Sequence, residues 1–121
     1  MLAVALASCF TLYAFAVVPT LNYYVDRHKE GKETYARMEQ ILDEQIPKDA
    51  SVKCSTFLLA HIADRAEIYD ATYHEDKPDV DYVVIDARYG DWRSTANAYI
   101  KQGYESVFYE KGRIAILKRA E

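Results

Sequence analysis

No lysine, arginine, aspartate or glutamate occurs in residues 1–25, whereas 15 basic and 19 acidic residues follow in the rest of the 121-residue chain. Within this uncharged segment, residues 2–18 form an apolar run interrupted only by Ser8, Cys9 and Thr11. A run of about 20 apolar residues is long enough for a helix to cross the hydrocarbon core of a bilayer. The absence of charge therefore predicts that residues 1–25 form a transmembrane helix.

Two other interpretations of this segment were weighed against a membrane span. A secretory signal peptide needs positive charge at its start, and the first three residues carry none. A lipoprotein signal is suggested by the small residues before Cys9, but the apolar run continues beyond that cysteine. Tyr23 and Tyr24 lie at the end of the segment, and such aromatic residues are typical of the membrane interface. These features favour the spanning helix.

Cysteine, proline and glycine are scarce, with 2, 3 and 4 residues respectively. Because Cys9 falls in the apolar segment and Cys54 in the polar part, we expect no structural disulfide. So little glycine and proline excludes a long low-complexity tract. The net charge is −4 with both signs interspersed, which argues against nucleic acid as a partner.

The motifs of common cofactor and metal sites are also missing. No glycine-rich loop follows a predicted strand, so nothing in the sequence predicts a bound nucleotide. His28, His61 and His74 are scattered, and neither cysteine has a close metal-ligating neighbour. We therefore expect no metal ion and no cofactor.

The polar part alternates between helical and extended patterns. Apolar side chains at spacings of three and four predict an amphipathic helix over residues 33–46. Further helices are expected at 55–62 and 93–102, and Gly103 is placed to end the second. A polar connection is expected at 74–78. The expected strands are 50–54, 67–69, 81–86, 105–109 and 113–118.

This order of elements predicts the α/β class, with one transmembrane helix followed by a small three-layer α/β domain. Strands that alternate with helices indicate a mostly parallel sheet, and the last two strands indicate a C-terminal antiparallel hairpin. We expect residues 1–25 to be the transmembrane helix and residues 26–46 a juxtamembrane linker with the amphipathic helix. Residues 47–121 are expected to form the α/β domain.

The loop after the strand at 81–86 carries the first candidate ligand-binding residues: Asp86, Arg88 and Trp92. Ligands of open α/β sheets bind beyond the carboxyl ends of the strands, where this loop is expected to lie. An acid, a base and an aromatic ring together can bind a sugar or an anionic head group. The alternative is a surface ion pair, either Asp86 with Arg88 or Asp91 with Arg93, and Trp92 packed as a lid on the core.

A second cluster contains the candidates His61 and Arg65. In a continuing helix His61 shares a face with Asp64 and with Arg65, at spacings of three and four, and a carboxylate can orient an imidazole for proton transfer. The alternative is that Asp64 or Arg65 fixes the turn before the next strand. An enzyme site would further require His61 and Asp86 to converge in one pocket. No nucleophile is spaced to complete such a site, so we assign no catalytic residue.

Four segments of the polar part carry a resemblance to a known family. They read IPKDASV at 46–52, STFLLAHIADR at 55–65, IY at 68–69 and DYVVID at 81–86. This pattern resembles the C-terminal region of a family of bacterial and archaeal polytopic membrane proteins of unknown function. That family is similar to the GT-C type of membrane glycosyltransferases, which use lipid-linked sugar donors. One departure is Ala60, which stands where the family has proline.

The resemblance implies that the apolar segment is the last span of a multi-pass protein and that the α/β domain is its extracytoplasmic tail. It also implies three kinds of partner: the lipid bilayer, the rest of the membrane protein, and a glycan or lipid-linked sugar. The catalytic acids of GT-C enzymes lie near their first transmembrane helices, which this sequence does not contain. No catalytic residue is therefore carried over.

The local charges point to the opposite side of the membrane. Arg27, Lys29 and Lys32 follow the apolar segment and favour a cytoplasmic domain by the positive-inside rule. Earlier spans of a multi-pass protein would override this bias. We expect an accessory, non-catalytic tail in the cell membrane. The alternative is a standalone single-span protein whose α/β domain binds a ligand or a protein.

Overall fold

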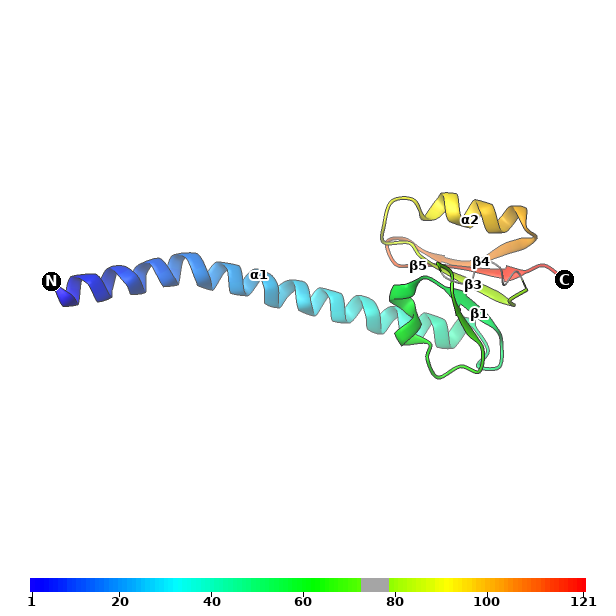
Figure 1. Ribbon diagram of the computed structural model, residues 1–121, viewed down its shortest axis with the longest axis horizontal. Helices are drawn as coiled ribbons and strands as arrows, with labels where there is room; N and C mark the ends of the chain where they lie inside the picture. The colour runs from blue at the N-terminus through cyan, green and yellow to red at the C-terminus, as the bar shows by residue number, and fades with distance from the viewer. Residues whose placement is uncertain (73–78) are drawn as a thin grey trace. The chain divides into compact units, whose positions relative to one another are not determined.

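The computed structural model describes residues 1–72 and 79–121 and contains one long helix followed by an α/β domain (Figure 1). The helix α1 spans Leu2–Gln45. The chain divides into two compact units, Met1–Ala36 and Arg37–Glu121. The last turns of α1 therefore belong to the same unit as the α/β domain.

In the first unit, α1 exposes its apolar side chains all round. By length and composition it is the one helix in the described chain that is able to cross a membrane, and none of that apolar stretch is buried. The hydroxyls of Ser8, Thr11 and Thr20 each donate to the carbonyl four residues earlier, at 2.9, 2.8 and 2.8 Å. Polar groups that are satisfied within the helix are what a hydrocarbon environment requires.

The second unit is built on a five-stranded sheet in the order β2-β1-β3-β5-β4. β1 pairs in parallel with β2 and β3, whereas β5 pairs antiparallel with β3 and β4. The α/β class and the C-terminal hairpin are confirmed. The sheet is evenly mixed, where we expected it to be mostly parallel, because β5 inserts between β3 and β4. The strands are β1 Val52–Cys54, β2 Ile68–Asp70, β3 Tyr82–Asp86, β4 Tyr104–Glu110 and β5 Ile114–Arg119.

Both faces of the sheet are covered, which gives the expected three layers. The helix α2, Trp92–Lys101, packs on one face over Val83 and Leu117. The end of α1 and the 3-10 helix η1, Thr56–His61, lie on the other side of the sheet (Figure 1). Neighbouring residues of a strand point to opposite faces, and both Val83 and Val84 are only 1% exposed.

Most of the helices and turns predicted from local sequence are present in the structure. The amphipathic stripe is buried at Met38, Leu42 and Ile46, which are 0 to 2% exposed, and it forms the end of α1. Gly103, with φ +96°, follows α2 and allows the turn into β4. The expected helix at 55–62 is a 3-10 helix. The polar connection expected at 74–78 lies outside the described residues.

The starts of β1 and β3 are joined by side-chain hydrogen bonds between Ser51 and Asp81. The Asp81 carboxylate accepts from the backbone N–H and the hydroxyl of Ser51, both at 2.9 Å. The backbone N–H of Asp81 donates to the Ser51 hydroxyl oxygen, also at 2.9 Å. The bonds from Ser51 hold the pKa of Asp81 below its usual value. These bonds fix β1 beside β3, and so bring together the carboxyl ends of the two strands.

We predict that Val84→Asp unfolds the α/β domain. The carboxylate would be buried in the central strand β3 without a partner, at a cost of about 3–5 kcal/mol. Val107→Asp is the matched control, because Val107 in β4 is 47% exposed. Thermal melting of the full chain in detergent, followed by circular dichroism, should show a loss of the cooperative transition for Val84→Asp alone. Equal melting of the two variants would show that β3 is not central to the fold.

Candidate functional site

A cavity of about 860 Å³ lies at the carboxyl ends of the three parallel strands. Lys53 and Ser55 reach it from β1, Thr72 follows β2, and Asp86 ends β3. The loop before α2 and one side of α2 along its length complete the wall. The other lining residues are Ala71, Ile85, Tyr89, Asp91, Trp92, Ser94, Thr95, Ala98, Tyr99 and Gln102.

The strand order explains why a cavity forms at this place. The chain leaves β1 toward β2 on one side of the sheet, whereas β3 lies on the other side of β1 and continues into α2. The connections therefore diverge between β1 and β3. Crevices of this kind, outside the carboxyl ends of parallel strands, are the usual ligand sites of α/β sheets.

The cavity combines a buried lysine side chain with several hydroxyl groups. Lys53 is 2% exposed, which is rare for a lysine. The hydroxyl oxygen of Ser55 is buried and has no hydrogen-bond partner within the described part of the chain. Thr72, Ser94 and Thr95 add further hydroxyls to the lining. Such a wall offers both hydrogen-bond donors and acceptors to a polar ligand.

Sequence reasoning missed Lys53 as a member of this site. The available signal was a lysine between two apolar residues of a predicted strand, Val52 and Cys54. Apart from Trp92, the residues that line the cavity from α2 were also missed, because small polar side chains on a helix are usually solvated.

Asp86 and Trp92, two of the predicted ligand-binding residues, line this cavity, and Arg88 lies beside it in an ion pair with Asp86. The Nε of Arg88 lies 2.9 and 3.1 Å from the two carboxylate oxygens, and its Nη2 lies 2.5 Å from Oδ2. The Asp86 side chain is 7% exposed. The ion pair that we gave as the alternative is therefore formed, and it keeps the carboxylate in place at the rim.

Trp92 packs against the hydrophobic core and also lines the cavity. Its ring stacks on Tyr109 of β4, with 4.8 Å between centroids and 22° between planes. It also packs against the buried cluster beneath α2. This packing fixes the ring, so its remaining surface is a rigid part of the cavity wall.

His61 and Arg65, the other two predicted site residues, are not among the residues that line the cavity. The Nδ1 of His61 lies 2.6 Å from a carboxylate oxygen of Glu39, at the end of α1. The structure therefore does not bring His61 and Asp86 together in this cavity, which the hypothesis of an enzyme site required.

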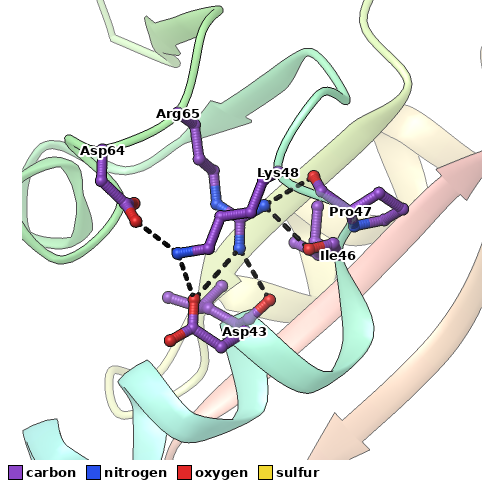
Figure 2. A network of polar contacts seen from close by, with 7 residues as sticks. Asp43, Ile46, Pro47, Lys48, Asp64 and Arg65 are labelled. Carbon is purple, nitrogen blue, oxygen red and sulfur yellow. Dashed lines mark hydrogen bonds and ion pairs between the residues drawn. The ribbon is translucent and has the colours of Figure 1, made fainter.

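Arg65 holds the end of α1, as Figure 2 shows. Its guanidinium is fully buried and donates to the carbonyls of Ile46, Pro47 and Leu42, at 2.8, 2.7 and 2.8 Å. Two of these carbonyls, those of Leu42 and Pro47, also accept backbone N–H bonds at 3.1 and 3.2 Å, and Arg65 adds a charged donor to them. The alternative above gave Asp64 or Arg65 the role of fixing the turn before β2, whereas these bonds of Arg65 tie that turn to the end of α1.

Lys48 forms a second, exposed bridge in the same network (Figure 2). It pairs with Asp43 at 2.9 Å and with Asp64. The hydrogen bond to Asp64 is the main cause of the raised pKa of Lys48, and it lowers the pKa of Asp64. All three side chains are more than half exposed, so solvent screens the bridge and its contribution to stability is small.

The buried thiol of Cys54 is not a reactive group. Burial, together with the charge of Asp70, raises the pKa of Cys54 to about 12. The thiol is therefore protonated at neutral pH and is a poor nucleophile.

Within residues 1–72 and 79–121, no three histidine, cysteine or acidic side chains are grouped as metal ligands.

We predict that Arg65→Met destabilises the α/β domain by about 3 kcal/mol, because several buried carbonyls would lose a charged donor. Arg93→Met is the matched control, because Arg93 is exposed on α2 and its side chain lies over the ring of Trp92. Its loss should cost less than about 1 kcal/mol. Urea unfolding of the two variants in the full chain measures the difference. Equal midpoints would contradict the capping role of Arg65.

Residues 1–113 match the model of the family described as "Predicted membrane protein (DUF2079)". No curated protein and no solved structure matches the chain.

Proposed function

This chain belongs to the DUF2079 family of predicted membrane proteins, and from that premise we propose that it is the last span and C-terminal soluble tail of a multi-pass protein. The observation that carries the proposal is the apolar, uncharged surface of α1 over residues 1–25. The segment exposes 14 large apolar or aromatic side chains, from Met1 to Val25. Their contact with water would be unfavourable, whereas contact with lipid is not, so the bilayer is the proposed surrounding of this segment.

We retain the division of the chain given by its sequence as part of this proposal. Residues 1–25 would span the bilayer, and residues 26–46 would connect that span to the α/β domain at residues 47–121. Tyr23 and Tyr24 support a membrane boundary at this point, because their rings are in edge-to-face contact at 5.6 Å and aromatic residues gather at the interface.

The finer part of the proposal is an accessory role in a GT-C-like membrane glycosyltransferase that uses a lipid-linked sugar donor. Its support is the resemblance carried by the segments at 46–52, 55–65 and 81–86. We assign no catalytic residue to this chain. The domain would shape the acceptor site or dock onto the membrane part, with the chemistry supplied by other spans.

We predict that the full-length protein, reconstituted in lipid vesicles, transfers sugar from a polyprenyl-phosphate donor to an acceptor. Loss of residues 47–121 should reduce the transfer without abolishing it, because the chemistry lies elsewhere. Radiolabelled donor and chromatography of the products measure this. Absence of transfer by the intact protein across a panel of such donors would contradict the glycosyltransferase role but not the membrane span.

We further propose that the protein lies in the cell membrane with its α/β domain on the extracytoplasmic side. We predict that alkaline phosphatase fused after Glu121 of the full-length protein is active, since this reporter folds only outside the cytoplasm. A green fluorescent protein fused at the same residue should then be dark. The reverse pattern would place the domain in the cytoplasm, as Arg27, Lys29 and Lys32 favour locally.

A standalone single-span protein that binds a ligand or another protein is the second candidate. The observation that favours it is the cavity beside Lys53 and Trp92, which would be functional without further spans. A cellular protein of the size of this chain, detected with an antibody against the α/β domain, would support this candidate. A much larger protein would support the multi-pass tail.

A further inference from the structure

We propose that the cavity at the carboxyl ends of β1, β2 and β3 binds a phosphorylated sugar. The phosphate would lie at Lys53, and the sugar ring would lie against the α2 side of the cavity. The inference rests on the ligand-binding candidate above and does not require that the protein transfers sugars.

The buried side chain of Lys53 is the observation from which we infer an anionic group on the ligand. Its side chain lies on the same face of the sheet as Tyr69 and Val83, its register partners in β2 and β3. Its side chain is 2% exposed, and in such surroundings a protonated amine attracts an anion more strongly than it does in water. Lys53 has polar interactions of its own, so a phosphate would join an existing network.

The side chains that line the cavity from α2 and its two ends are the observation from which we infer a ligand with several hydroxyl groups. Asp91, Thr95, Ala98 and Gln102 recur at spacings of three and four, so they share one face of the helix. These side chains are small or polar, and Ser94 adds another hydroxyl beside them. The buried Ser55 hydroxyl lies across the cavity on the β1 side. Sugar hydroxyls both donate and accept, as these groups do.

Two aromatic side chains provide a surface for a ring. Trp92 and Tyr99 both line the cavity, and the first is held by its stacking on Tyr109. The C–H groups on the face of a sugar ring pack favourably on an aromatic face, which is apolar and carries negative charge density. A free phosphate ion would leave this surface unused.

The carboxylates of the lining are compatible with this ligand. The charge of Asp86 is compensated by Arg88, at 2.5 to 3.1 Å. Asp91 is exposed at the start of α2, and both carboxylates are acceptors for sugar hydroxyls. The volume of about 860 Å³ lies within the usual range for small-ligand sites.

Fluorescence of Trp92 tests the proposal directly, because this is the single tryptophan of the chain and it lines the cavity. The full chain in lipid nanodiscs is titrated with glucose 6-phosphate, glucose and inorganic phosphate. We predict a saturable change in emission with glucose 6-phosphate. Glucose and inorganic phosphate should each bind about tenfold or more weakly, because each lacks one part of the recognition.

Lys53→Met should weaken the binding of glucose 6-phosphate by about tenfold to a hundredfold, because a charged hydrogen bond is lost. It should leave the weak binding of glucose unchanged. Lys101→Met is the matched control, because Lys101 is exposed and does not line the cavity.

A second variant tests the same cavity in case Lys53→Met does not fold. Ser94→Ala with Thr95→Ala removes two exposed hydroxyls from the cavity wall and should weaken glucose 6-phosphate by about tenfold. Asn97→Ala, also exposed on α2 but outside this cavity, is its control. Circular dichroism of each variant measures whether it is folded.

Three results would overturn the proposal. They are no saturable change in emission at millimolar ligand, equal affinity for inorganic phosphate and glucose 6-phosphate, and unchanged affinity in the folded cavity variants. None of these results bears on the membrane span or on glycosyl transfer, which the vesicle assay and the reporter fusions test separately.

Discussion

The fold of this protein is constrained first by the absence of charge from residues 1–25. In hydrocarbon no water is present to satisfy backbone N–H and C=O groups, so a single segment that crosses it must be a helix. The helix α1 meets this requirement for its side chains as well, because the hydroxyls of Ser8, Thr11 and Thr20 donate hydrogen bonds to carbonyls of the same helix. The apolar surface that remains has no protein partner within its compact unit, and lipid is the surrounding that makes such a surface stable.

The end of α1 is subject to a different constraint, because its last turns belong to the α/β unit. There the carbonyls are buried and need donors, which the guanidinium of Arg65 provides from the turn before β2. Arg65 is fully buried, whereas the neighbouring Lys48 bridge is exposed, so the first interaction dominates the second. The same helix therefore ends as part of a soluble core, with Met38 and Leu42 packed inside it.

Much of this fold could be predicted from local patterns. The apolar run of β3 predicted a strand covered on both faces, and the periodicity of residues 33–46 predicted the buried stripe of α1. The insertion of β5 between β3 and β4 could not be predicted, because hairpin sequences do not specify which of their strands meets the sheet. Of the residues that line the cavity, the sequence singled out Asp86 and Trp92. The positions of Lys53 and Arg65 depend on partners distant in sequence, and periodicity carries no information about them.

The accessibility of Cys9 to water tests the central claim most directly. Cys9 is exposed on α1, and Cys54 is buried, so Cys54→Ala leaves a single thiol within the apolar segment. A hydrophilic maleimide is added to leaky vesicles that contain this variant, with Lys101→Cys in a variant lacking Cys9 as the exposed reference. If lipid surrounds α1, Cys9 stays unlabelled until the membrane is dissolved in denaturing detergent, whereas the reference thiol reacts at once. Equal labelling of the two thiols in intact membranes would contradict the account.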